Sequence, residues 1–151
     1  MADIGELVME HVKLADWDNI QIGDKGYHGK TITETDLVLF AGISGDFNPM
    51  HVNKEYAKTT PYGKRIVHGI ISVSLIAGVL GMKLPGAGTV HVSQKVDFKK
   101  PVFIGDTLTA VAEILEKFTK KEGKLRFLRI KTDVYNQNNE IVTDGEALVI
   151  I

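Results

Sequence analysis

Residues 66–82 read IVHGIISVSLIAGVLGM, and this stretch decides the fold. Its apolar residues lie on all sides of a helical wheel, so a helix here needs cover on every side. A bilayer span takes about 20 apolar residues, and this stretch is shorter and interrupted by His68, Ser72 and Ser74. The stretch therefore predicts one buried helix that ends before Pro85 and Gly86.

The sequence after this helix predicts the sheet that covers it. Residues 90–98 alternate apolar and polar side chains, as a half-buried strand does, with Val90, Val92, Val96 and Phe98 on the apolar side. Further β-type stretches follow at 107–115, 125–135 and 141–151, with turn residues at 122–123 and 136–139. No segment between them is long enough for a crossover helix, so the strands should be antiparallel. A central apolar helix wrapped by a mostly antiparallel sheet is an α+β architecture.

The first third of the chain predicts shorter elements. Residues 26–33 suit a first strand, and Thr33 suits the N-cap of a helix that runs to about Ser44. The inward-facing residues of that helix are expected to be Leu37, Phe40 and Ala41. Asn53 can cap a short helix that ends before Pro61. Residues 3–15 have helical apolar spacing, which predicts an N-terminal helical extension over about residues 1–16 of a single domain, 1–151.

Composition excludes several classes of function. The net charge is −1, so no overall field favours nucleic acid or an anionic membrane, and neither is expected as a partner. The chain has no cysteine, which excludes disulfides, thiolate nucleophiles and Cys-ligated metals. A cysteine-free chain with no basic and apolar leader at its N-terminus fits the cytoplasm, the expected location.

The candidate chemistry lies in residues 45–51, GDFNPMH. Asp46 and His51 stand on either side of Pro49, which disfavours helix at Asn48 and bends the chain. At such a bend a carboxylate and an imidazole can point into one space and act as a general acid–base pair. In isolation the pattern is more often an Asn-Pro turn with an incidental surface histidine, so the neighbouring sequence has to decide.

That neighbouring sequence contains several blocks in a fixed order: FAGISGDFNPMHV at 40–52, YAKTTPYG at 56–63, RIVHGII at 65–71, LPGAG at 84–88 and FKKPVFIGD at 98–106. In order and spacing they resemble the MaoC-like family of (R)-specific enoyl-CoA hydratases, the PhaJ type. The resemblance covers about residues 20 to 151. It implies a hot-dog fold, dimerisation edge to edge as a homodimer or dimer of dimers, and hydration of trans-2-enoyl-CoA to (R)-3-hydroxyacyl-CoA.

The resemblance also implies roles for residues at the bend. Asp46 and His51 would bind the catalytic water, with Asp46 helping to activate it and His51 moving the proton. Asn48 would orient His51 or the water, or else bond only to its own turn. The backbone N–H of Gly69, near the start of the buried helix, would stabilise enolate charge on the thioester oxygen. Glycine there could instead serve close packing of helix on sheet.

Other residues have weaker assignments. Lys64, Arg65, Lys99 and Lys100 could meet the phosphates of coenzyme A, and Gly88 could border the substrate channel. His68 is interpreted as a hydrogen-bonded structural histidine that points away from the acid–base pair. No paired-ligand spacing such as H-E-x-x-H occurs, so no metal is expected, and no cofactor other than the coenzyme A of the substrate.

Two other functions remain open at this point. A hot-dog acyl-CoA thioesterase would need an acid poised for hydrolysis but not the D-x-N-P-x-H pairing. A non-catalytic module that binds acyl thioesters would need neither Asp46 nor His51.

Overall fold

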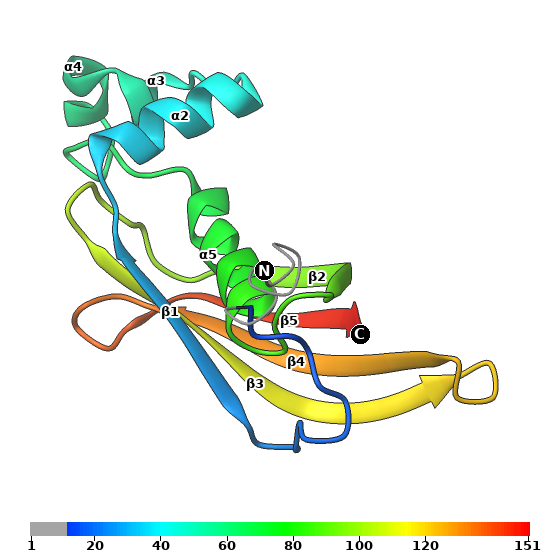
Figure 1. The fold of residues 1–151 in the computed structure, drawn as a ribbon. Coiled ribbons are helices and arrows are strands. Elements are labelled where there is room, and N and C mark those ends of the chain that lie inside the picture. Colours follow the sequence, from blue (N-terminus) through cyan, green and yellow to red (C-terminus); the bar gives the residue numbers. More distant parts are fainter. Residues whose placement is uncertain (1–11) are drawn as a thin grey trace, which may run out of the picture.

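The computed structural model describes residues 12–151, in which a five-stranded antiparallel sheet curves around one long helix (Figure 1). In chain order the elements are β1 (Lys25–Thr31), α2 (Glu34–Ser44), α3 (Pro49–Val52), α4 (Lys54–Lys58), α5 (Gly69–Met82), β2 (Val90–Phe98), β3 (Thr107–Lys120), β4 (Leu125–Tyr135) and β5 (Ile141–Ile150). The strand order is β1-β3-β4-β5-β2. The predicted α+β, hot-dog arrangement is confirmed.

Helix α5 packs on the concave side of the sheet, and its inward residues form the centre of the core. Ile76 and Val79 on α5 are fully buried, as are Leu108 on β3 and Ile130 on β4. Side chains of this size each contribute about 1.5–3 kcal/mol on full burial, so the helix–sheet contact stabilises the fold strongly. Helices α2, α3 and α4 form a separate group beyond the N-terminal end of α5 (Figure 1).

Helix α5 begins at Gly69, three residues later than predicted. The residues before it are extended: Ile66 forms a β-bridge with Phe103, and the N–H of Val67 donates to the carbonyl of Val102 at 2.8 Å. The apolar pattern could not reveal this start, because the pairing partner lies far along the chain. The late start matters because it places the backbone N–H of Gly69 in the first turn.

One side of α5 and part of β2 have no cover from residues 12–151. Ile70 and Met82 on α5 are 49% and 68% exposed, and Val90 and Val92 on β2 are 59% and 48% exposed. The expectation of a helix covered all round, beside a half-buried strand, is therefore wrong for a single chain. Of the apolar residues of β2, Val96 is partly buried against the core, whereas Val90, Val92 and Phe98 stay exposed, and a register shift between His91 and Ser93 interrupts the alternation.

The helix that leads to the candidate site has the predicted start and a well-defined end. The hydroxyl of Thr33 and the carboxylate of Asp36 cap the first turn of α2 reciprocally. The inward residues Leu37 and Ala41 are buried as predicted. At the other end Gly45 has φ +75° and donates its N–H to the carbonyl of Ala41, which turns the chain sharply into Asp46.

The predicted N-terminal helix lies mostly outside the described residues, and its last part is not helical. Leu14 forms a parallel bridge with Ala87, and Ala87 exchanges backbone hydrogen bonds with Lys13 and Ala15. Gly86 is needed here, because a Cβ at that position would lie 2.5 Å from the carbonyl oxygen of Lys13. Within residues 12–151 the helices are all too short or too polar to cross a membrane.

Candidate active site

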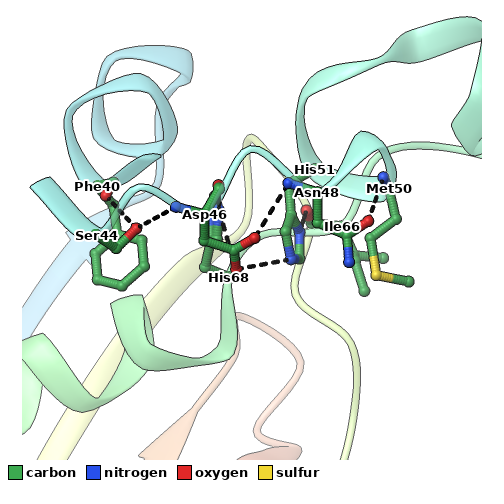
Figure 2. A network of polar contacts seen from close by, with 8 residues as sticks. All are labelled: Phe40, Ser44, Asp46, Asn48, Met50, His51, Ile66 and His68. Atoms are coloured by element: carbon green, nitrogen blue, oxygen red, sulfur yellow. Dashed lines mark hydrogen bonds and ion pairs between the residues drawn. The ribbon is translucent and has the colours of Figure 1, made fainter. Parts of the chain in front are cut away.

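Asp46 directly follows the left-handed turn at Gly45, and the two oxygens of its carboxylate have different neighbours. Oδ1 accepts the backbone N–H of Asn48 at 3.1 Å, an arrangement that fixes the side chain over its own turn. Oδ2 faces two histidine rings (Figure 2). The side chain remains 48% exposed, so solvent reaches the carboxylate.

His51, on the short helix α3, lies beside this carboxylate and is buried. Its Nδ1 is 2.8 Å from the carbonyl oxygen of Ile66. A carbonyl can only accept, so Nδ1 carries the proton and the neutral ring has a bare lone pair on Nε2. That Nε2 lies 3.9 Å from Oδ2 of Asp46, too far for a direct hydrogen bond. A gap of this length suits one water that contacts both atoms.

His68 also belongs to this cluster, contrary to the prediction that it points away. Its Nε2 lies 2.9 Å from the backbone carbonyl oxygen of Asp46 and 3.8 Å from Oδ2 of the same residue. The prediction assumed a helical step from His68 to Gly69, but His68 is the N-cap of α5 and has ψ 127°. The prediction that it is hydrogen-bonded is confirmed. The position of His68 inside an apolar stretch was the signal in the sequence that its ring needs a hydrogen-bond partner nearby.

The three side chains raise the question of a metal ion, because one atom from each of Asp46, His51 and His68 lies within 4.8 Å of the others. The nitrogen of His68 that faces the Asp46 carboxylate, at 3.8 Å, is Nε2, which bonds to the Asp46 carbonyl and must therefore carry a proton. A protonated nitrogen offers a metal no lone pair. Two ligand atoms remain, fewer than the three protein ligands typical of a catalytic zinc site.

Asn48 acts on its own turn. Its side-chain oxygen accepts the N–H of Met50 at 3.1 Å, and it caps α3 with Pro49 in the first turn. Its backbone carbonyl accepts the N–H of His51 at 2.8 Å. The side-chain bond to its own turn, one of the two alternatives drawn from the sequence, is therefore present, and a backbone bond to His51 accompanies it.

Gly69 is the first residue of α5, and its surroundings fit both roles proposed for it, as an N–H donor and as a site of close packing. Among residues 12–151 no acceptor bonds to its N–H, so this donor is available to a ligand. A Cβ at this position would lie 2.9 Å from Cε1 of Phe98, so glycine also allows Phe98 on β2 to pack closely. The donor reading and the packing reading are therefore compatible.

A cavity of about 350 Å³ joins the site to the sheet, and its lining includes His51, Gly69, Phe98, Lys99 and Lys100. This volume lies in the range of small-molecule sites. Lys99 lies near Asp97 and Asp144, and Lys100 pairs with Glu140 at 2.5 Å.

Lys64 and Arg65, expected beside these lysines, line a different cavity of about 300 Å³. Both guanidinium amines of Arg65 bond to the Glu34 carboxylate, which lowers the pKa of Glu34 and raises the pKa of Arg65. The structure thus separates the four predicted basic residues into two pairs. Gly88 lines none of the described cavities. It follows Ala87, whose backbone forms hydrogen bonds with Lys13 and Ala15.

Known proteins resemble this chain over most of its length. A curated (R)-specific enoyl-CoA hydratase from Rhodospirillum rubrum is 41% identical over 89% of this chain and 90% of its own. A 3-hydroxybutyryl-CoA dehydratase from Methylorubrum extorquens is 36% identical over 94% of this chain and 87% of its own. The unliganded structure of R-hydratase PhaJ1 from Pseudomonas aeruginosa superposes with a TM-score of 0.85 at 39% identity, covering 92% of this chain and 86% of that one. The model of the MaoC like domain matches residues 19–136, and the chain belongs to this family.

Proposed function

We propose that this protein is an (R)-specific enoyl-CoA hydratase, which adds water reversibly across the double bond of trans-2-enoyl-CoA. One observation carries the proposal: Nε2 of His51, the ring nitrogen not bonded to the Ile66 carbonyl, and Oδ2 of Asp46 lie 3.9 Å apart, beside a cavity that Gly69 lines. The similarity to curated hydratases supports the same reaction. The dehydratase name of another relative describes the reverse direction.

The reaction needs one water, one proton acceptor and one proton donor. The water held between Asp46 and His51 loses a proton as its oxygen attacks C3 of the enoyl group. The electrons of the double bond move onto the thioester, and the backbone N–H of Gly69 stabilises the resulting oxyanion. The Asp46–His51 pair, which took this proton from the water, then returns one to C2, which leaves the hydroxyl on C3 and restores the thioester. Neither residue needs a net change of protonation over the cycle.

We propose no metal or added cofactor, since the protonated Nε2 of His68 leaves the cluster short of ligands. Coenzyme A enters as part of the substrate. Lys99 and Lys100 are the preferred contacts for its phosphates, because they share the cavity with His51 and Gly69. The absence of cysteine suits a reducing compartment, so the cytoplasm is the proposed location.

We also propose that two copies associate through β2, either as a homodimer or as each dimer within a dimer of dimers. Within residues 12–151 neither edge strand pairs with a further strand, but β1 carries Lys25 and Lys30, and lysines on an edge strand oppose pairing. β2 instead exposes Val90, Val92 and Phe98, and Phe98 lies against the start of α5 at Gly69. Pairing β2 with its copy would cover both apolar surfaces at once.

The function is tested by incubating the purified protein with crotonyl-CoA and no added metal or nucleotide. The conjugated thioester absorbs in the ultraviolet, so hydration appears as loss of absorbance, and chiral analysis should give the (R)-3-hydroxy product. Activity should persist in EDTA. Release of free coenzyme A without a hydroxyacyl product would support the thioesterase instead, and binding without turnover would support the non-catalytic module.

A further inference from the structure

The groups of the candidate site come from two separate segments of the chain. Asp46 and His51 lie on the turn and short helix after α2, whereas the Gly69 N–H lies at the start of α5. Two histidine hydrogen bonds join these segments in opposite directions (Figure 2). His51 donates from Nδ1 to the carbonyl of Ile66, and His68 donates from Nε2 to the carbonyl of Asp46.

His68 is not placed to exchange protons with a substrate. Its Nε2–H is occupied by the Asp46 carbonyl, and its Nδ1 is buried with no hydrogen-bond partner among residues 12–151. The residue is only 3% exposed, and it does not line the cavity that contains His51 and Gly69. A catalytic acid or base would need one of its nitrogens open to the reacting atoms.

The ring of His68 instead supports the ring of His51. The two ring centroids are 3.9 Å apart with an interplanar angle of 31°, and Phe40 contacts His68 with a centroid separation of 4.9 Å. Helix α3 has only four residues, so it gives His51 little support of its own. The stack Phe40–His68–His51 therefore connects His51 to α2 and to the start of α5.

We propose that His68 is a positioning residue for the hydration reaction, an inference that rests on the proposed function. Its Nε2–H fixes the main chain of Asp46, and its ring face fixes the imidazole of His51. Together these contacts hold Oδ2 of Asp46 and Nε2 of His51 at the separation that one water can bridge. Such geometry matters because a misplacement of about 1 Å can cost a factor of about 10² in rate.

Two substitutions separate the hydrogen bond from the ring. His68→Phe keeps an aromatic ring and removes the donor, and His68→Gln keeps an amide donor near the position of Nε2. We expect His68→Phe to lower kcat by about 10- to 100-fold with KM changed less than about twofold. His68→Gln restores the donor but not the ring, so its kcat should lie between those of His68→Phe and wild type. His28→Phe is the matched control, because His28 is a half-buried histidine that packs on α5 at Gly78, and its kcat should stay within about twofold of wild type.

Wild-type kcat in His68→Phe, or an equal loss in His68→Gln and His68→Phe, would overturn the proposal. Nitrogen-15 NMR of the wild-type imidazoles, without substrate, gives a readout that depends on neither turnover nor the folding of a variant. His68 should be the Nε2–H tautomer and His51 the Nδ1–H tautomer; an Nδ1–H tautomer at His68 overturns the proposal. If wild type fails to hydrate crotonyl-CoA, the proposed function fails, and the tautomers still report whether the two hydrogen bonds exist.

Discussion

What each histidine of the candidate site can do depends on which of its two ring nitrogens carries the proton. A carbonyl acceptor at Ile66 sets which nitrogen of His51 is free, and a second one at Asp46 does the same for His68. Two identical side chains, with rings in contact, therefore have different chemical capacities. His51 presents a lone pair toward the carboxylate, and His68 presents none.

This difference leads to a prediction for Asp46 and His51. Asp46→Asn keeps the shape and loses the negative charge, and His51→Gln keeps a polar group and loses proton exchange. Each should lower kcat by about 10²–10⁴ without unfolding the protein, because each removes one of the two groups that hold and activate the water. Steady-state kinetics with crotonyl-CoA and a thermal melt check this.

The double variant should be little worse than the poorer single one, since groups that share one step are not additive. Asp18→Asn, at an exposed acid outside the site, is the control and should leave kcat unchanged. Near-wild-type turnover in either single variant of the pair would show that the catalytic residues lie elsewhere.

At the scale of helices and strands, the chain was predictable where its signals are local. Period-two alternation gave β2, turn residues gave the β3–β4 and β4–β5 connections, and Thr33 gave the start of α2. The start of α5 was not predictable, because it depends on the pairing of Ile66 with Phe103. The same limit applies to His68, whose partner Asp46 is 22 residues away.

The contact between α2 and the segment before α5 leads to a pH-dependent prediction. Hydrogen bonding to Arg65 lowers the pKa of Glu34 from its usual 4.5. A lowered folded-state pKa means that the pair stabilises the fold above the usual carboxyl pKa, and that this contribution is lost as the pH falls through the folded-state value. Glu34 is 54% exposed, so its contribution should not exceed about 1 kcal/mol.

Glu34→Gln should therefore lower the free energy of unfolding by up to about 1 kcal/mol at pH 7, and the difference from wild type should shrink below pH 4.5. Urea unfolding at several pH values measures it. Glu55→Gln is the control, because Glu55 pairs with Lys58 only within α4 and at 76% exposure. A difference that grows toward acid pH would contradict the assignment.

At the scale of the whole molecule, the exposed apolar surface predicts self-association. The protein should sediment as at least a dimer, with twice the chain mass of 16.6 kDa, at micromolar concentration. Val92→Lys should shift it toward monomer, because a charge on an apolar edge strand opposes edge-to-edge pairing. Sedimentation velocity on both proteins tests this.

Leu115→Lys is the matched control for this variant. Leu115 is 39% exposed on β3 and lines a cavity apart from the candidate site, so the same charge there should leave the dimer intact. A stable and active wild-type monomer at micromolar concentration would rule out the dimer proposal. The sequence pointed to apolar surfaces on β2 and α5 but not to what lies against them, since an apolar pattern does not say which chain covers it.

Asp46, His51 and the Gly69 N–H, the groups proposed to react, all lie within residues 46–69, whereas the sheet is built from residues on both sides of that interval. The reacting groups and the strands of the sheet thus come from largely separate stretches of the sequence. Substitutions on the outer face of the strands leave the reacting groups unchanged. The surface of the sheet can therefore vary while the reacting groups stay together in one short segment. A graft of this interval between relatives would transfer the reacting groups together with the carbonyls that set their tautomers.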